Sequence, residues 1–101
     1  MITVSIENGP QETRVKIGGE MDVVATTGQV SELNQVLAIA GKALEIDCSG
    51  LEYVSSAGLR FFMQLKHESI AKGGSVRITH LNEDVADIFR MSGFENIFDI
   101  A

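Results

Sequence analysis

The chain has 101 residues, of which 45% are hydrophobic and 22% charged, a composition that is typical of one folded domain and excludes an intrinsically disordered chain. Its 8 basic and 14 acidic residues give a formal net charge of −6, which argues against direct binding to nucleic acid or anionic lipid, because those surfaces are themselves negative. The single cysteine, Cys48, excludes an internal disulfide. No signal peptide is visible, and no apolar run approaches the roughly 20 residues that span a bilayer. We therefore expect one cytoplasmic domain over residues 1–101, without direct membrane insertion.

Alternating apolar and polar residues predict two strands at the start of the chain, over residues 2–7 and 13–17. Turn-forming residues 8–11 join these strands as a hairpin, and residues 18–22 end the second one. A helix follows, in which Thr26 is predicted to be the cap and Gln29 to reach back as in a capping box. Its apolar residues form one stripe, and Gly41 is expected to end it.

Residues 44–48 alternate again and predict a third strand, which residues 49–54 connect to a second helix. This helix is expected to begin near Ser55 or Ser56 and to end at Gly73 and Gly74. Its inner face is predicted to consist of Leu59, Phe62, Leu65 and Ser69. Phe61 and Met63 flank this stripe, and we expect both at the margin of the core; the alternative is that one of them provides apolar surface to a partner.

The remaining elements are a strand over residues 76–80, a helix capped by Asn82 and closed by Gly93, and a short strand over residues 97–100. Phe94 is expected to fold back on Phe89, as in a Schellman ending. The predicted order is β-β-α-β-α-β-α-β. Because apolar and polar residues alternate along the strands, one face of the sheet is expected to be buried and the other partly exposed to solvent. The sequence thus predicts an α/β domain with one small mixed sheet and helices mainly on one face.

The usual catalytic and ligand-binding motifs are missing from the sequence. The glycine spacing gives no dinucleotide fingerprint, and there is no Gly-Lys-Ser/Thr phosphate loop. His67 and His80 are too few for a typical metal site, and both are interpreted as structural. Ser56-Ala57-Gly58 resembles half of a nucleophile elbow, but Val54 stands where that motif has glycine. We therefore expect no enzyme activity, no catalytic residue, no cofactor and no metal.

The pair Ser55-Ser56 at the start of the second helix has two interpretations. One serine suffices as an N-cap, so the second hydroxyl is left over. The first turn of a helix also favours phosphate, and phosphorylation of Ser56 would add about −1.5 to −2 charges there. Arg60, four residues on, is placed to pair with that charge. The residues alone favour capping and leave a phosphorylation switch as a candidate.

Residues 45–59 have the sequence Glu-Ile-Asp-Cys-Ser-Gly-Leu-Glu-Tyr-Val-Ser-Ser-Ala-Gly-Leu, which resembles the signature of the STAS domain and in particular that of stand-alone bacterial anti-sigma-factor antagonists. Gly19-Glu20-Met21-Asp22 is similar to the Gly-Glu-Leu-Asp segment of that family. The resemblance extends over nearly the whole chain and implies a single STAS domain.

The resemblance also implies a function and a set of site residues. An unphosphorylated antagonist binds an anti-sigma factor that is a serine kinase with a GHKL-type ATPase fold, and so regulates transcription indirectly. Phosphorylation separates the pair, and a PP2C-type phosphatase reverses it. By motif position the phosphate acceptor is Ser56. Ser55 is the alternative, because it stands where the family most often has aspartate and so provides a second candidate hydroxyl. The implied partner-binding residues are Asp22, Ser55, Ser56, Ala57, Gly58 and Arg60. The alternative function is a STAS subunit of a membrane lipid-transport complex.

Overall fold

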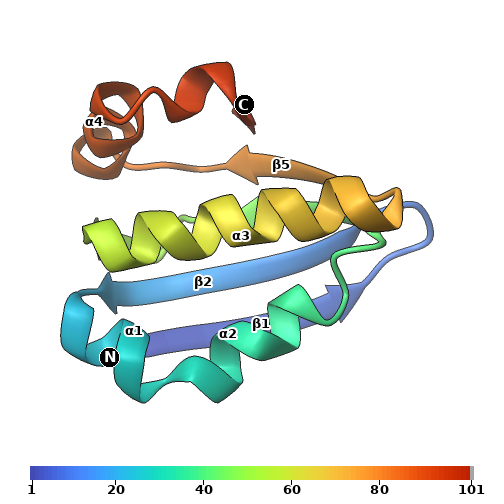
Figure 1. Cartoon of the computed structure of the whole chain (residues 1–101), viewed down its shortest axis with the longest axis horizontal. Coiled ribbons are helices and arrows are strands. Elements are labelled where there is room, and N and C mark those ends of the chain that lie inside the picture. Colours follow the sequence, from blue (N-terminus) through green and yellow to red (C-terminus); the bar gives the residue numbers. More distant parts are fainter. Residues whose placement is uncertain (101) are drawn as a thin grey trace.

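The computed structural model describes residues 1–100 as one mixed sheet with helices packed against it (Figure 1). The strands are β1 (Ile2–Asn8), β2 (Thr13–Met21), β3 (Ala43–Asp47), β4 (Leu51–Val54), β5 (Ser75–Thr79) and β6 (Asp99–Ile100). The helices are α1 (Val23–Gly28), α2 (Val30–Leu37), α3 (Ser56–Lys72) and α4 (Glu83–Met91), with a 3-10 turn at Phe94–Asn96. The α/β class and the mixed sheet agree with the sequence prediction.

The sheet is built around the long strand β2. Strands run in the order β1-β2-β3-β5-β6, and β1 is antiparallel to β2 whereas the other pairs are parallel. The first part of β2 pairs with β3, and its last part, Gly19–Met21, pairs with β4. Gly19 has φ +88°, and a Cβ there would lie 1.9 Å from the carbonyl oxygen of Met1, so only glycine fits. This branching brings the ends of β2 and β4 together beside the start of α3.

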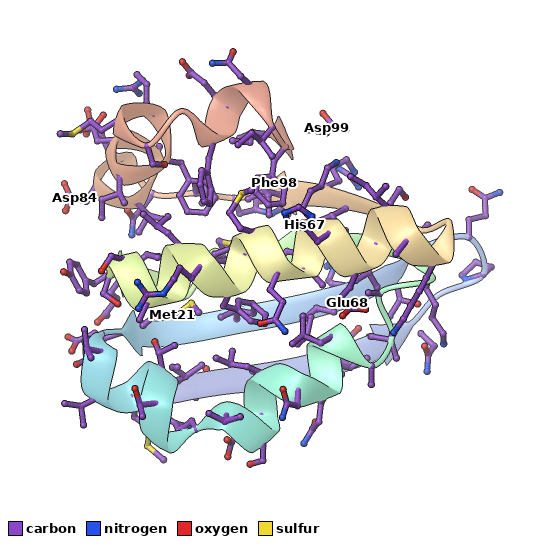
Figure 2. All side chains as sticks on the ribbon, in the orientation of Figure 1. Met21, His67, Glu68, Asp84, Phe98 and Asp99 are labelled. Atoms are coloured by element: carbon purple, nitrogen blue, oxygen red, sulfur yellow. The ribbon has the colours of Figure 1, made fainter. Side chains whose placement is uncertain are left out.

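Helices α1, α2 and α3 cover one face of the sheet (Figure 1). On β2, Val15 and Ile17 are buried beneath them, whereas Arg14 and Lys16 point to the open face. Phe62 of α3 is fully buried and makes edge-to-face contacts with Phe89 and Phe98, at centroid distances of 5.3 and 6.4 Å. These rings connect α3 to α4 and to the C-terminal segment, where Phe98 lies beside α3 (Figure 2).

The predicted helix starting at Thr26 is wrong in its start, its end and its continuity. Asp22 caps α1, since its Oδ1 accepts from the backbone N–H of Ala25 at 2.7 Å. Thr26 therefore lies inside α1, and a second helix, α2, ends at Leu37 rather than at Gly41. The side chain of Gln29 leaves the helix and bonds both backbone groups of Ile2, at 2.6 and 2.8 Å. The reason is that an edge strand has free N–H and C=O groups, and one side-chain amide satisfies a donor and an acceptor together.

Other local predictions are confirmed or need adjustment. Asn82 caps α4 through the backbone N–H of Val85 at 2.8 Å, and Gly93 has φ +79°. Phe94 packs on Phe89 as predicted, with centroids 5.4 Å apart. The connection 49–54 contains β4, and the last strand is only Asp99–Ile100 because the 3-10 turn precedes it. Phe61 is buried rather than at the core margin, because the inner face of α3 also faces α2.

Candidate functional site

The two serines at the start of α3 have different environments. Ser55 is the N-cap, with extended backbone, and the residue is only 7% exposed. Its hydroxyl donates to the carbonyl oxygen of Met21 at 2.7 Å and accepts from the backbone N–H of Gly58 at 3.3 Å. Its own backbone N–H also donates to that Met21 carbonyl, at 2.9 Å. Ser55 thus joins the end of β2 to the first turn of α3.

Ser56 is the first residue of α3, and it is exposed. The capping role is already filled by Ser55, so the Ser56 hydroxyl is not required to satisfy the free backbone N–H groups of the first turn. Arg60, one turn further along the same helix, is exposed as well. The structure therefore brings an accessible hydroxyl, a helix N-terminus and a guanidinium to one end of the molecule.

Gly58 allows the close approach of α3 to the strand ends. A Cβ at this position would lie 2.8 Å from Cγ1 of Val54, 3.1 Å from Cβ of Met21 and 3.2 Å from the Met21 carbonyl oxygen. Met21 accordingly lies against the first turns of α3 (Figure 2). Gly58 is buried and Ala57 is half-buried. Among the predicted partner-binding residues, Gly58 and Ser55 thus build the site, whereas Ser56 and Arg60 are on its surface.

Asp22 lies next to this site, but its carboxylate is engaged as the cap of α1. The residues that follow it carry apolar surface that sequence reasoning missed: Val23 and Val24 are exposed, Val24 by 82%. Tyr53, on β4 shortly before the serines, is exposed too. A signal was present, since two consecutive β-branched residues directly after a cap lie outside any apolar stripe. Exposed apolar side chains at the ends of β2 and β4, the strands that meet the start of α3, are typical of a protein-binding surface.

The remaining reactive groups of the sequence are one thiol and two imidazoles. Burial raises the pKa of the Cys48 thiol to about 12, so it stays protonated at neutral pH. His67 is exposed on α3, and His80 lies at the end of β5 with its Nδ1 3.5 Å from Asp47 Oδ1. Within residues 1–100, no three His, Cys, Asp or Glu side chains gather in a way that could hold a metal ion. In the same residues, no helix is both long and apolar enough to cross a membrane.

Comparisons with known proteins add to this geometry. A family model described as "Mlab, STAS domain" matches residues 4–99. Over 100 residues the chain is 29% identical to the anti-sigma-B factor antagonist of Bacillus subtilis, a match that covers 99% of this chain and 91% of that protein.

Two solved structures have the same fold. The structure of an anti-sigma factor antagonist from Mycobacterium paratuberculosis superposes with a TM-score of 0.83 at 22% identity, covering 99% of this chain and 85% of that one. The phosphorylated form of SpoIIAA from Bacillus gives a TM-score of 0.67 at 15% identity, covering 98% and 91%. At these identities the two structures establish the fold alone.

Proposed function

The chain belongs to the STAS domain family, and on that premise we propose that it is an anti-sigma factor antagonist controlled by phosphorylation of Ser56. Anti-sigma factor antagonists are non-enzymatic regulators. In this proposal the unmodified chain binds, in the cytoplasm, an anti-sigma factor that is a GHKL-type serine kinase. Phosphorylation of Ser56 releases that partner, and a PP2C-type phosphatase restores binding. The full-length similarity to the anti-sigma-B factor antagonist supports this choice.

The observation that carries the proposal is the division of roles between the two serines. Ser55 is buried and bonded on both sides, to Met21 and to Gly58, so a kinase would have to open the start of α3 to reach it. Ser56 is exposed and free of the capping role. Of the two candidate acceptors, Ser56 is thus the one that a protein kinase can reach without unfolding the site.

The expected effect of the phosphate is on the partner rather than on the fold. Negative charge at a helix N-terminus is favoured by the helix dipole, so α3 is expected to stay folded. The same charge adds bulk and a hydration shell to a surface that has to pack closely against a partner. Desolvating a phosphate, or placing it opposite an acidic partner group, weakens such an interface strongly.

Intact-mass and fragment analysis tests the site after incubation with a candidate GHKL-type kinase and ATP. One phosphate is expected, localised to Ser56, and none on the Ser56→Ala variant. Ser31, an exposed serine on α2, provides the matched control: Ser31→Ala is expected to be phosphorylated like the wild-type chain. Phosphate on Ser55, or on neither serine, contradicts the assignment.

Binding to the same kinase tests the switch. Ser56→Ala is expected to bind constitutively, even with ATP present, whereas Ser56→Glu is expected to bind weakly because it carries permanent negative charge at the contact. Isothermal titration calorimetry with each variant gives the affinities. Equal affinity of Ser56→Glu and wild-type chains would rule out an electrostatic block.

A second candidate function is a STAS subunit of a membrane lipid-transport complex. It is retained because the matching family model is described as "Mlab, STAS domain", a description that names no regulator of sigma factors. Affinity purification of the Ser56→Ala variant separates the two candidates. A kinase-like ATPase as the bound protein favours the antagonist, and a transporter subunit favours the alternative.

A further inference from the structure

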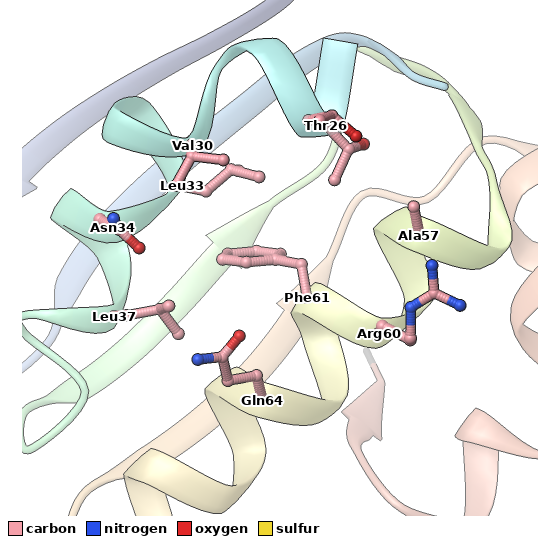
Figure 3. Close-up of a pocket in the computed structure, with 10 residues that line it drawn as sticks. Thr26, Val30, Leu33, Asn34, Leu37, Ala57, Arg60, Phe61 and Gln64 are labelled. Atoms are coloured by element: carbon pink, nitrogen blue, oxygen red, sulfur yellow. The ribbon is translucent and has the colours of Figure 1, made fainter. Parts of the chain in front are cut away.

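A groove of about 330 Å³ runs between the α1–α2 segment and α3 (Figure 3). Phe61 projects from α3 across the floor of this groove toward Val30 and Leu33 of α2 (Figure 3). Val30 remains 49% exposed although it lies over this apolar floor. The volume is at the small end of ligand sites, which are about 300–1,000 Å³. It has room for one or two side chains of a protein partner rather than for a large cofactor.

The rim of the groove is polar, and its charge is positive. Asn34 and Gln64 border it on the α2 and α3 sides, and both are exposed. Among the described residues that line the groove, Arg60 is the only charged one. Arg60 also forms no ion pair with the other residues of the described chain. A local cation in a chain of net charge −6 selects an acidic group as its partner.

We propose that this groove is a docking site for an apolar segment of the anti-sigma factor that carries a carboxylate, with its apolar side chain over Phe61 and Val30 and its carboxylate on Arg60. The identity of the partner rests on the proposed function above. The chemistry of the segment rests on the apolar floor and on the single cation at its edge.

The groove is coupled to the phosphorylation site through Arg60. Ser56 and Arg60 are one turn apart on α3, and Ala57, next to Ser56, is part of the groove wall. Residues four apart on a helix are neighbours, so a phosphate on Ser56 is within reach of the Arg60 guanidinium. Pairing with the phosphate takes the only cation of the groove away from the partner's carboxylate. Phosphorylation therefore weakens the groove contact as well as the contact at Ser56 itself.

A pair of small probes tests the chemistry of the groove without any kinase. The probes are 4-phenylbutyrate and 4-phenylbutylamine, which share a shape and differ in charge, and binding is followed by the backbone amide NMR signals of the ¹⁵N-labelled chain. The carboxylate is expected to shift the signals of Asn34, Arg60 and Gln64 with half-saturation at about 1 mM, as a ligand of this size allows. The amine is expected to bind about fivefold more weakly, a difference set by one exposed charge pair.

Variants identify the groups responsible. Arg60→Gln is expected to abolish the preference for the carboxylate, and phosphoserine incorporated at position 56 is expected to do the same. Lys72→Gln is the matched control, because Lys72 is a cation of the same helix that does not line the groove; the preference should persist in this variant. Equal binding of the two probes to the wild-type chain, signal shifts away from the groove, or no shifts at all overturn the proposal.

Binding to the kinase separates failure of this inference from failure of the proposed function. Val30→Asp places a carboxylate against the apolar floor of the groove and is expected to lower kinase affinity at least about tenfold. Ile70→Asp, at an apolar position that is 68% exposed near the other end of α3, is the control and should bind like wild type. If the kinase phosphorylates Ser56 but binds Val30→Asp normally, the groove inference fails and the proposed function stands. If the kinase binds no variant and not the wild-type chain, the proposed function fails, and the groove loses its assigned partner with it.

Discussion

The two faces of the sheet are stabilised in different ways, one by apolar packing and the other by pairing of charged side chains. The covered face buries apolar side chains beneath α1, α2 and α3, and Phe62 is the aromatic centre of that layer. Within residues 1–100 the helices α1, α2 and α3 leave the opposite face of β2, β3 and β5 uncovered, yet Glu45 and Asp47 of the central strand are buried there. Helices on one face thus provide the site at Ser56, while the other face is stabilised by charge pairing.

The charge pairing on the open face follows the strand register. Glu45 lies between Arg14 and Arg77 on the neighbouring strands, with N···O distances of 3.2 and 3.8 Å. The hydroxyl of Thr79 donates to Glu45 at 2.8 Å. This bond is the main cause that lowers the pKa of Glu45; the two arginines add to it, and burial opposes it. A buried acid on an uncovered sheet face is thus kept charged where donors on the adjacent strands face it, as they do at Glu45.

Asp47, two residues further on, is also kept charged, but its main donor belongs to the loop after β3 rather than to a neighbouring strand. Burial acts to raise the pKa of this carboxyl, but the hydrogen bond from the backbone N–H of Ser49 at 2.9 Å opposes it. The nearby His80 and Lys16 also favour the charged form, and the net result is a lowered pKa. The stability of the open face therefore depends on ionised carboxylates, whereas the aromatic centre of the covered face is stabilised without them.

The largest effect is expected on the covered face. Phe62→Ala should cost about 3–5 kcal/mol of unfolding free energy, because it leaves a cavity among several rings, and domains of this kind have about 5–15 kcal/mol in total. Urea denaturation followed by circular dichroism measures the loss. Tyr53→Ala is the control, since this ring is exposed; its cost should stay below about 1 kcal/mol. Similar costs for both variants would mean that the aromatic centre is not where the stability of this face lies.

A smaller effect is expected from the central acid of the open face. Glu45→Gln keeps the size of the side chain but removes the charge that Arg14 and Arg77 face, and it should cost about 1–2 kcal/mol at pH 7. The arginines remain partly exposed, so water compensates some of the loss. Glu52→Gln, an exposed acid on β4, is expected to change stability by less than about 0.5 kcal/mol. If Glu45→Gln is as neutral as this control, the open face is not stabilised by its charges.

The pH dependence of stability distinguishes the two faces directly. Because the folded-state pKa of Glu45 lies below its ordinary value of 4.5, its contribution is present above that value and is lost as the pH falls through the folded pKa. The unfolding free energy of the wild-type chain should therefore fall from about pH 5 downward, and more steeply than that of Glu45→Gln. Denaturation curves between pH 7 and pH 3 give the two slopes. Parallel slopes would show that Glu45 makes no pH-linked contribution.

The smallest effect concerns a polar atom on the covered side. The hydroxyl oxygen of Thr26 is buried and has no hydrogen-bond partner among residues 1–100. Thr26→Val keeps the shape and removes this oxygen, so stability should rise by about 0.5–1 kcal/mol, as valine and threonine have similar helix propensities. Thr27→Val, at the exposed neighbouring position, should be neutral. If Thr26→Val instead lowers stability in thermal unfolding, the hydroxyl has a hydrogen-bond partner and the prediction is wrong.

Sequence patterns were sufficient where a single local cause decides the structure. Asn82 and Gly93 act within one turn of the chain, and both behave as predicted. Thr26 and Gln29 have the spacing of a capping box, but the residue that caps the helix is Asp22. The prediction failed because the Gln29 amide forms two hydrogen bonds with the backbone of Ile2 on the edge strand β1, 27 residues away. A contact over that separation leaves no periodic signal in the sequence.

The candidate site shows the same division between local and distant causes. The pattern of residues 45–59 was enough to indicate the family and to select the pair Ser55-Ser56. It left open which serine has the free hydroxyl, because that depends on the carbonyl of Met21, 34 residues from Ser55. The groove beside Phe61 was equally out of reach, since its walls come from α1, α2 and α3.

By itself the sequence determined the α/β class, the alternation that buries one sheet face, and the signature around the serines, because these follow from short-range periodicity and residue type; it did not determine strand β4 or the division of the first helix into α1 and α2. Only the tertiary structure decided that Ser55 is tied to the end of β2 and that Ser56 faces solvent. It also decided that Glu45 of β3 is paired with arginines on both neighbouring strands. The physical reason is that hydrogen bonds and burial depend on which distant segments meet, and parallel strand pairing brings together residues that no local pattern connects.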